Sequence, residues 1–122
     1  MVQIVVVGGG PAGMMAAGQA AKTGAKVVLL ERNSRLGKKL AITGKGRGNI
    51  TNAADIEDMI RQYPGNRSFL YGPLYRFTNE DLRRFFRDLG VATVIERGGR
   101  VFPESQRAQD IVAALEKVLI NH

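Results

Sequence analysis

Three glycines placed directly after a short apolar segment constrain this chain more than any other feature. Residues 2–7 are nearly all β-branched and apolar, which predicts a strand buried on both faces, as in a parallel sheet. The pattern Gly8-x-Gly10-x-x-Gly13 follows at once. An alanine-rich stretch at residues 14–23 then predicts a helix.

The segment after this helix completes a recurring unit. Gly24 is placed to end the helix, and a second apolar run at residues 26–30 leads to Glu31. Strand, glycine turn, helix and strand fit into about 30 residues, the length of one βαβ unit. The sequence therefore predicts an α/β fold of the Rossmann type.

Each residue of the glycine turn has a physical reason to be there. Gly8 allows a tight turn, Gly10 lets a pyrophosphate approach the backbone, and Gly13 lets helix and strand pack closely. Pro11 suits the first helical turn, where its missing N–H costs nothing. The helix start then attracts phosphates, and Glu31, 18 residues after Gly13, suits the ribose hydroxyls while repelling a 2′-phosphate. The pattern indicates a dinucleotide site.

The remaining elements are predicted from caps and periodicity. Residues 33–52 suggest a long loop with a short helical turn at 38–42, Asn52 is a candidate cap for a helix through Arg61, and residues 64–73 look irregular. Further predictions are a helix capped by Thr78 and ended by Gly90, a hairpin over 91–102, and a helix over 108–119 capped by Ser105.

The chain's positive charge is concentrated in one loop. The 122 residues carry a formal net charge of +7. Residues 32–54 hold six cations and no carboxylate, so this flexible glycine-rich loop is suited to surround an anionic ligand. Its cations are Arg32, Arg35, Lys38, Lys39, Lys45 and Arg47.

Composition excludes several classes of site. The chain has no cysteine, and its one histidine is His122, so we expect no disulfide and no metal site. No apolar run approaches the roughly 18 residues of a membrane span, and no signal peptide is seen. We therefore expect a cytoplasmic protein with no membrane partner.

Five segments resemble successive motifs of one bacterial group. They are Gly8–Gly13, Glu31-Arg32, Lys38-Lys39, Thr43–Asn52 and Gly99–Pro103. The group comprises FAD-dependent flavoproteins described as aminoacetone-oxidase-like or bile-acid-dehydratase-like NAD(P)/FAD-dependent oxidoreductases. The resemblance implies that residues 1–122 are the N-terminal part of an FAD-binding, Rossmann-like domain, incomplete by itself and without a second domain.

The resemblance also assigns residues to the cofactor. FAD is the implied cofactor, with NAD(P)H as an electron donor in the full-length protein. The catalytic residues are not identified. Residues matched to cofactor binding are Gly8, Gly10, Pro11, Ala12, Gly13, Glu31, Arg32, Lys39, Arg47, Asn49 and Thr51. Members of the group usually have a cysteine where this chain has Gly48, which places any role of that thiol in doubt.

Two other functions remain open from the sequence. One is a non-catalytic dinucleotide-binding or basic interaction module, and the other is an NAD-linked dehydrogenase half-domain. Arginines among the aromatic residues of 61–87 could meet nucleic acid phosphates, but the arginines at 83, 84 and 87 fall on the solvent side of a helix. Nucleic acid is therefore not an expected partner, whereas association through an open sheet edge is.

Overall fold

The computed structural model describes residues 1–121, and His122 lies outside them. The chain forms two compact units: Met1–Gly48 with the segment from Ser105 onward, and Asn49–Glu104. The first holds a parallel pair of strands and the second a three-stranded antiparallel sheet. The predicted α/β class is confirmed, while the assignment of 1–122 to one FAD-binding domain stays a prediction.

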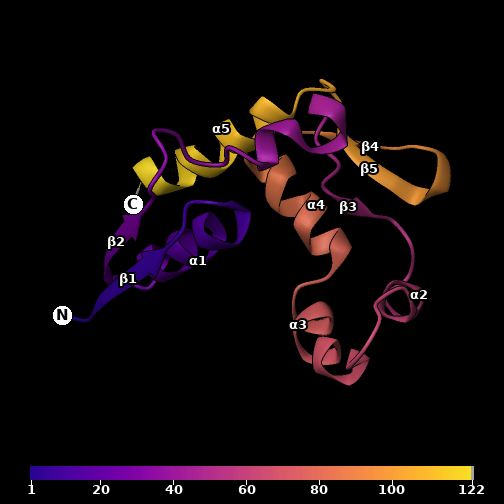
Figure 1. Ribbon diagram of the computed structural model, residues 1–122, viewed down its shortest axis with the longest axis horizontal. Helices are drawn as coiled ribbons and strands as arrows, with labels where there is room; N and C mark the ends of the chain where they lie inside the picture. Colours follow the sequence, from indigo (N-terminus) through magenta and orange to yellow (C-terminus); the bar gives the residue numbers. More distant parts are fainter. Residues whose placement is uncertain (122) are drawn as a thin grey trace. The chain divides into compact units, whose positions relative to one another are not determined.

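The first unit begins with the predicted βαβ arrangement (Figure 1). Strand β1 (Gln3–Val7) and strand β2 (Lys26–Leu30) pair in parallel along their whole length. Helix α1 (Pro11–Lys22) connects them and has proline in its first turn. Gly24 ends the connection with φ +88°, a left-handed conformation that glycine adopts without strain.

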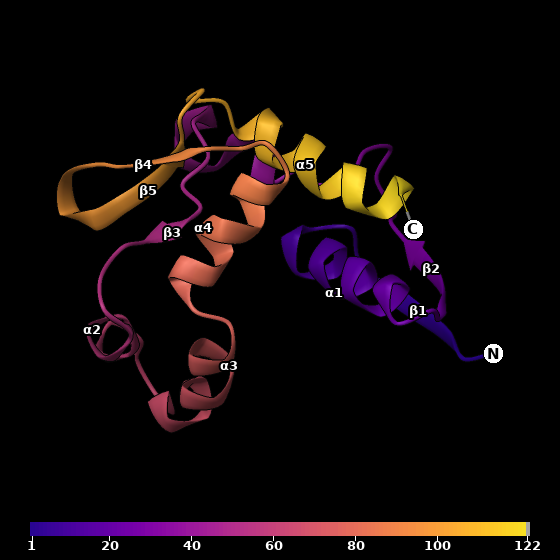
Figure 2. The same ribbon diagram turned by 180° about the vertical axis from the view of Figure 1, so that it is seen from behind.

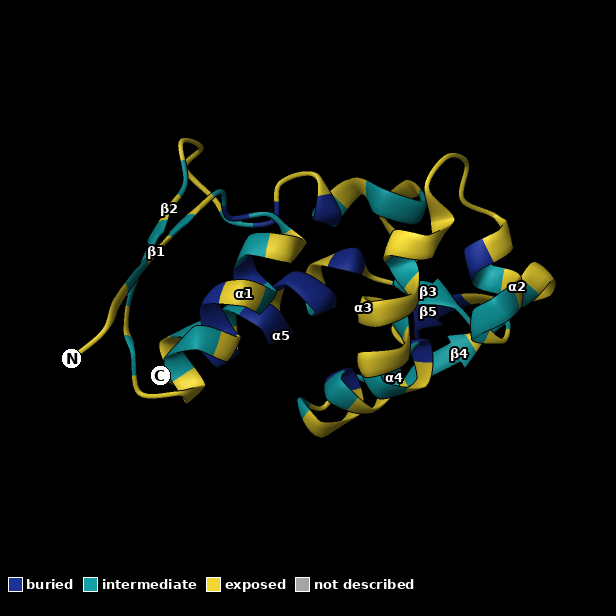
Figure 3. Cartoon of the chain, turned by 90° about the horizontal axis from the view of Figure 1, so that it is seen from below, coloured by how far each residue is buried: buried dark blue, intermediate teal, exposed yellow. Residues whose placement is uncertain are grey.

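The core of this unit gathers around helix α5 (Ala108–Ile120), which packs on α1 and on the 3₁₀ segment η1 (Leu40–Gly46). Figure 3 shows buried residues along α5 and on the side of α1, whereas the two strands have none. Removal of this apolar surface from water is the main stabilising term. The buried side chains are Met14, Ala17, Leu40, Ala108, Ile111, Val112, Ala114, Leu115 and Val118.

The prediction that β1 is buried on both faces is wrong for this unit. Ile4 and Val6 are half-buried, while Val5 and Val7, on the opposite face of the pleat, are 54% and 82% exposed. The reason is that α1 packs on this two-stranded sheet and can cover only one of its faces. Among the described residues, β1 pairs only with β2, so each of these two strands has one open edge. Association of the protein through such an open edge stays a prediction.

The second unit contains short helices and the antiparallel sheet (Figure 2). Strand β5 (Arg100–Pro103) lies between β3 (Thr51–Asn52) and β4 (Thr93–Ile95), and the turn η3 (Arg97–Gly99) joins β4 to β5. The predicted hairpin is confirmed. The helical segments are α2 (Ile56–Arg61), η2 (Arg67–Leu70), α3 (Tyr71–Arg76) and α4 (Asn79–Asp88).

Two predicted caps are wrong, and the stretch predicted as irregular is partly helical. Asp55 rather than Asn52 caps α2, because the Asn52 side chain is held by Gly98 and Ala54. Arg107 begins α5 without a side-chain cap, and the Ser105 hydroxyl accepts only the N–H of Arg107, at 3.4 Å. Segments η2 and α3 fall largely in the 64–73 region, where glycine and proline obscured the helical pattern.

Thr78 caps α4 as predicted, and the cap is reciprocal. The Thr78 hydroxyl accepts the Asp81 N–H at 3.1 Å, and the Asp81 carboxylate accepts the Thr78 N–H at 2.9 Å. Thr78→Ala should therefore destabilise α4 by about 1 kcal/mol, measured by hydrogen exchange of its amides. Thr78→Ser keeps the oxygen and should retain most of the stability. An equal loss in both variants would show that the methyl group, not the cap, matters.

Candidate functional site

The glycine turn leaves three backbone donors without a partner at the start of α1. Gly8 adopts φ +102°, and its N–H extends the sheet by donating to the Leu30 carbonyl at 2.7 Å. Within residues 1–121, no hydrogen bond is found for the backbone N–H of Gly10, Ala12 or Gly13. Unpaired N–H groups at the positive end of a helix dipole form an anion-binding surface.

The protein leaves no room for a side chain at Gly13 but leaves open space at Gly10. A Cβ atom on Gly13 would lie 1.8 Å from the Gly8 carbonyl oxygen, so this position excludes any side chain. A Cβ atom on Gly10 would meet no atom within 4 Å, and Gly10 has an ordinary extended backbone. The chain itself therefore does not require glycine at position 10. The open space there fits an approaching ligand.

Glu31 joins the glycine turn to the loop after β2. Its Oε1 accepts the Gly9 N–H at 2.8 Å, and its Oε2 accepts the Asn33 N–H at 2.7 Å. These two backbone donors, with Asn33 the stronger influence, hold the pKa of the Glu31 carboxyl below its usual value. The carboxylate thus stabilises the turn as well as facing the site, a role that the sequence did not reveal.

This pKa shift predicts a dependence of stability on pH. Because the folded pKa of Glu31 lies below its usual value of 4.5, its contribution is complete above pH 4.5 and is lost as the pH falls through the folded value. A ¹³C NMR titration of the Glu31 carboxyl should give a midpoint below 4.5.

Glu31→Gln should reduce the loss of stability of this unit in acid. Glu104→Gln, which alters an exposed carboxyl in the other unit, should leave it unchanged. A Glu31 midpoint at or above 4.5 would contradict the two hydrogen bonds.

A pocket of about 630 Å³ lies over the glycine turn and brings six of the sequence-predicted residues together. They are Gly8, Gly10, Pro11, Glu31, Arg32 and Lys39. Asn33, Lys38 and Ile42 also line it. Of these, Lys38 belongs to the basic loop seen in the sequence, whereas Asn33 and Ile42 carry no local signal. Three exposed cations and one carboxylate at the helix start favour a polyanion bearing hydroxyl groups.

The other five predicted residues lie outside this pocket. Ala12 and Gly13 are in the first turn of α1. Arg47 follows η1, and its Nε donates to the Gln106 side chain at 2.8 Å. Asn49 and Thr51 belong to the second unit. With its amide oriented to face two carbonyls, Asn49 donates to Val101 at 3.3 Å and Thr51 at 3.1 Å.

The departure from the family pattern at Gly48 has a structural counterpart. Gly48 is buried and adopts φ +82°. A Cβ atom would lie 2.7 Å from the Ile111 side chain and 3.0 Å from the Ala108 backbone. A cysteine would therefore strain the backbone and collide with α5, so this position accommodates glycine.

Residues 1–121 contain neither a candidate membrane-spanning helix nor a candidate metal-binding cluster. No helix within residues 1–121 is long and apolar enough to cross a membrane. No cluster of three or more His, Cys, Asp or Glu side chains in that range is placed to hold a metal ion.

The chain is similar in sequence to several known proteins. The chain is 36% identical over 121 residues to a protein named 3-dehydro-bile acid delta(4,6)-reductase from Clostridium scindens, covering 98% of this chain and 29% of that protein. It is 30% identical over 112 residues to a ribosomal RNA dihydrouridine synthase from Escherichia coli, covering 91% and 27%. A stretch of 46 residues is 52% identical to an NADH oxidase from Thermoanaerobacter brockii, covering 38% and 7%.

This chain matches only part of each of these relatives. The chain spans less than a third of the length of each relative. One of them is named for ribosomal RNA, so the expectation that nucleic acid is not a partner gains no support. The family model "HI0933-like protein Rossmann domain" matches residues 2–122, and the chain therefore belongs to the HI0933-like Rossmann domain family.

Proposed function

We propose that this chain binds the ADP part of FAD within a flavin-dependent oxidoreductase. The observation that carries the proposal is the pocket in which an open Gly10, the start of α1, Glu31 and Lys39 meet. Membership of a Rossmann family supports a dinucleotide. The names of the reductase and the NADH oxidase among the relatives support redox chemistry.

Each group of the pocket has a matching part of the ligand. The N–H group of Gly10 in the pocket, and those of Ala12 and Gly13 in the adjoining first turn of α1, would donate to the pyrophosphate, and Arg32 and Lys39 would neutralise its charge. Glu31 would accept the adenosine ribose hydroxyls, because each of its oxygens has a second lone pair beside the one facing Gly9 or Asn33.

Three predicted residues outside the pocket belong to the proposal as well. Arg47, Asn49 and Thr51 are assigned to FAD by resemblance, and Arg47 is already anchored by Gln106. Bound flavin would supply hydride or electron transfer. We propose NAD(P)H as the electron donor of the full-length protein and the cytoplasm as its location.

The alternative function, a basic module that binds other molecules through its positive charge, is weakened by the ion pairs of helix α4. Arg83 pairs with Glu80 and Arg84 with Asp81, each at 3.2 Å. Such neighbouring pairs reduce the positive field that a nucleic acid would meet. The NAD-linked alternative shares the same pocket and must be separated by experiment.

The proposal is tested by competition at the pocket. FAD binding by the purified chain is followed by the change in flavin fluorescence, and ADP should displace it. FMN, which lacks the AMP half of FAD and keeps only one phosphate, should compete far more weakly than ADP. NADPH should compete more weakly than NADH because Glu31 repels a 2′-phosphate. Saturable binding of NADH without binding of FAD would favour the dehydrogenase half-domain instead.

A further inference from the structure

A second pocket, of about 570 Å³, lies within the first unit between the loop that follows β2 and helix α5. Residues 34–38 of the loop, two residues of η1 and two residues of α5 line it. Lys38 and Ile42 also line the pocket over the glycine turn, whereas Glu31 and the glycines of that turn do not line this one. The second pocket is therefore a neighbour of the candidate ADP site rather than a part of it.

Gly37 holds the loop against α5. It adopts φ +66°, and its N–H donates to the Gly9 carbonyl at 2.8 Å. A Cβ atom on Gly37 would lie 3.0 Å from the Val112 side chain, so the loop backbone passes directly over this residue of α5. Gln109 and Glu116 share a helix face with Val112, because they lie three residues before it and four residues after it. They therefore flank the loop, about 10 Å apart along the helix axis.

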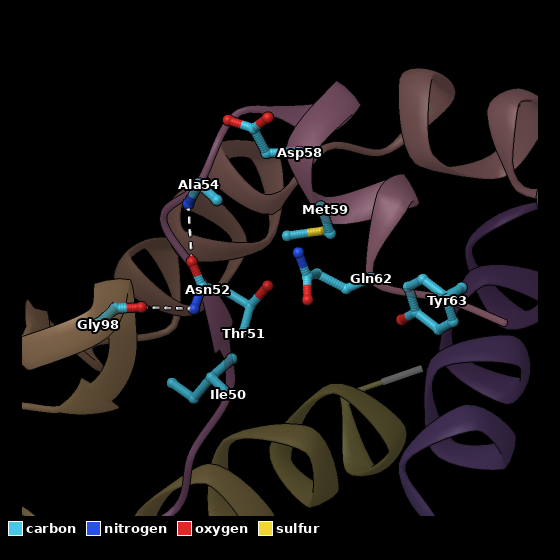
Figure 4. A pocket seen from close by; sticks show the side chains of 9 residues that line it. All are labelled: Ile50, Thr51, Asn52, Ala54, Asp58, Met59, Gln62, Tyr63 and Gly98. Atoms are coloured by element: carbon cyan, nitrogen blue, oxygen red, sulfur yellow. Dashed lines mark hydrogen bonds between the residues drawn. The ribbon is translucent and has the colours of Figure 1, made fainter.

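Opposite charges line this pocket without pairing. Within residues 1–121, no hydrogen bond or ion pair is found for the side chains of Arg35, Lys38 and Glu116. In the pocket of the other unit, shown in Figure 4, the one charged side chain is Asp58, and it pairs with Arg61. Because Lys38 also lines the ADP pocket, the charges that belong to the second pocket alone are Arg35 and the half-buried Glu116.

The remaining lining defines the other part of a ligand. Leu36 and Ala41 are half-buried, and Ile42 is 72% exposed. An aliphatic group placed on these three residues would remove apolar surface from water. A ligand that matches the whole pocket thus carries an anionic group, a cationic group and a short apolar chain.

We propose that this pocket binds a zwitterionic α-amino acid with an apolar side chain. The planar guanidinium of Arg35 pairs with the carboxylate of the ligand. Glu116 accepts hydrogen bonds from its ammonium group, and the Gln109 amide binds either end. The ligand side chain lies on Leu36 and Ile42. No dinucleotide is needed for this binding, which is independent of the ADP-binding function proposed above.

The test is an NMR titration of the ¹⁵N-labelled chain with L-leucine and with two analogues that each lack one charge. Isocaproate is leucine without its ammonium group, and isoamylamine is leucine without its carboxylate. Leucine should shift the Gln109 side-chain amide and the backbone amides of Leu36 and Ala41, with roughly millimolar affinity. Each analogue loses one set of charge-assisted hydrogen bonds and should bind about tenfold more weakly.

Glu116→Gln is the matching change on the protein. It should weaken the binding of leucine about tenfold but bind isocaproate at least as tightly as wild type, which shows that the pocket is still folded. Arg35→Gln should weaken leucine in the same way and spare isoamylamine. Glu104→Gln, at an exposed carboxyl of the other unit, should bind leucine as wild type does.

Three results would overturn the amino-acid site. They are an absence of saturable shifts with leucine, equal binding of leucine and the two analogues, and wild-type affinity for leucine in Glu116→Gln. ADP shifts at Gly10, Ala12 and Gly13 report the other site separately, so the failure of one proposal is distinguishable from the failure of the other.

Discussion

Gly13→Ala is expected to destabilise the unit of β1, α1 and β2 by about 2 kcal/mol. The new Cβ atom would lie 1.8 Å from the Gly8 carbonyl oxygen, a backbone atom that cannot rotate away. Such overpacking costs about 3 kcal/mol, while alanine in a helix gains about 1 kcal/mol over glycine. Hydrogen exchange of the α1 amides measures the difference.

Gly72→Ala is the matched control for this substitution. Gly72 lies in helix α3, and a Cβ atom there would meet nothing within 4 Å. Only the helix preference then applies, so this variant should be as stable as wild type or slightly more stable. If the α1 amides of Gly13→Ala exchange as slowly as those of wild type, Gly13 does not lie as close to the Gly8 carbonyl as described.

Gly10→Ala should have the opposite result, with stability unchanged and binding lost. The position has φ −78° and ψ −174°, which alanine adopts freely, and its Cβ would meet no protein atom within 4 Å. The added methyl group would instead occupy the space proposed for the pyrophosphate. A clash of about 1–3 kcal/mol corresponds to an affinity for ADP about 5- to 150-fold lower, measured by isothermal titration calorimetry.

Two comparisons make the Gly10→Ala result specific. Gly72→Ala should bind ADP as wild type does, because it lies in the other unit. The hydrogen exchange of α1 in Gly10→Ala should match wild type, which shows that lost binding is not lost folding. Unchanged ADP affinity in Gly10→Ala would mean that the ligand does not approach this part of the turn.

Sequence patterns located the βαβ unit because its signals are local. The apolar runs of β1 and β2, the alanine-rich helix and Pro11 at its start each report on neighbouring residues. The Thr78 cap could be predicted for the same reason. In contrast, β3 has two residues, too few for an alternating pattern, and its position depends on pairing with β5.

The sequence predicted which residues form the glycine turn of the candidate site, but not the hydrogen bonds that join them to the rest of the unit. Glycine spacing and the position of Glu31 indicated the turn, but the bond from Gly9 to Glu31 depends on a side-chain rotamer. Arg47 was assigned to the cofactor, although its contact with Gln106 spans 59 positions of the chain. Such long-range contacts are set by packing against α5, which no local motif encodes.

The ADP-binding site at the glycine turn is tested most directly by an NMR titration of the ¹⁵N-labelled chain with ADP. The largest shifts should fall on the backbone amides of Gly10, Ala12 and Gly13, whose N–H groups have no partner among the described residues. Saturable shifts at these three amides, absent in Gly10→Ala, are the expected result. Shifts confined to the basic loop, or none that saturate, would contradict a pyrophosphate bound at the start of α1.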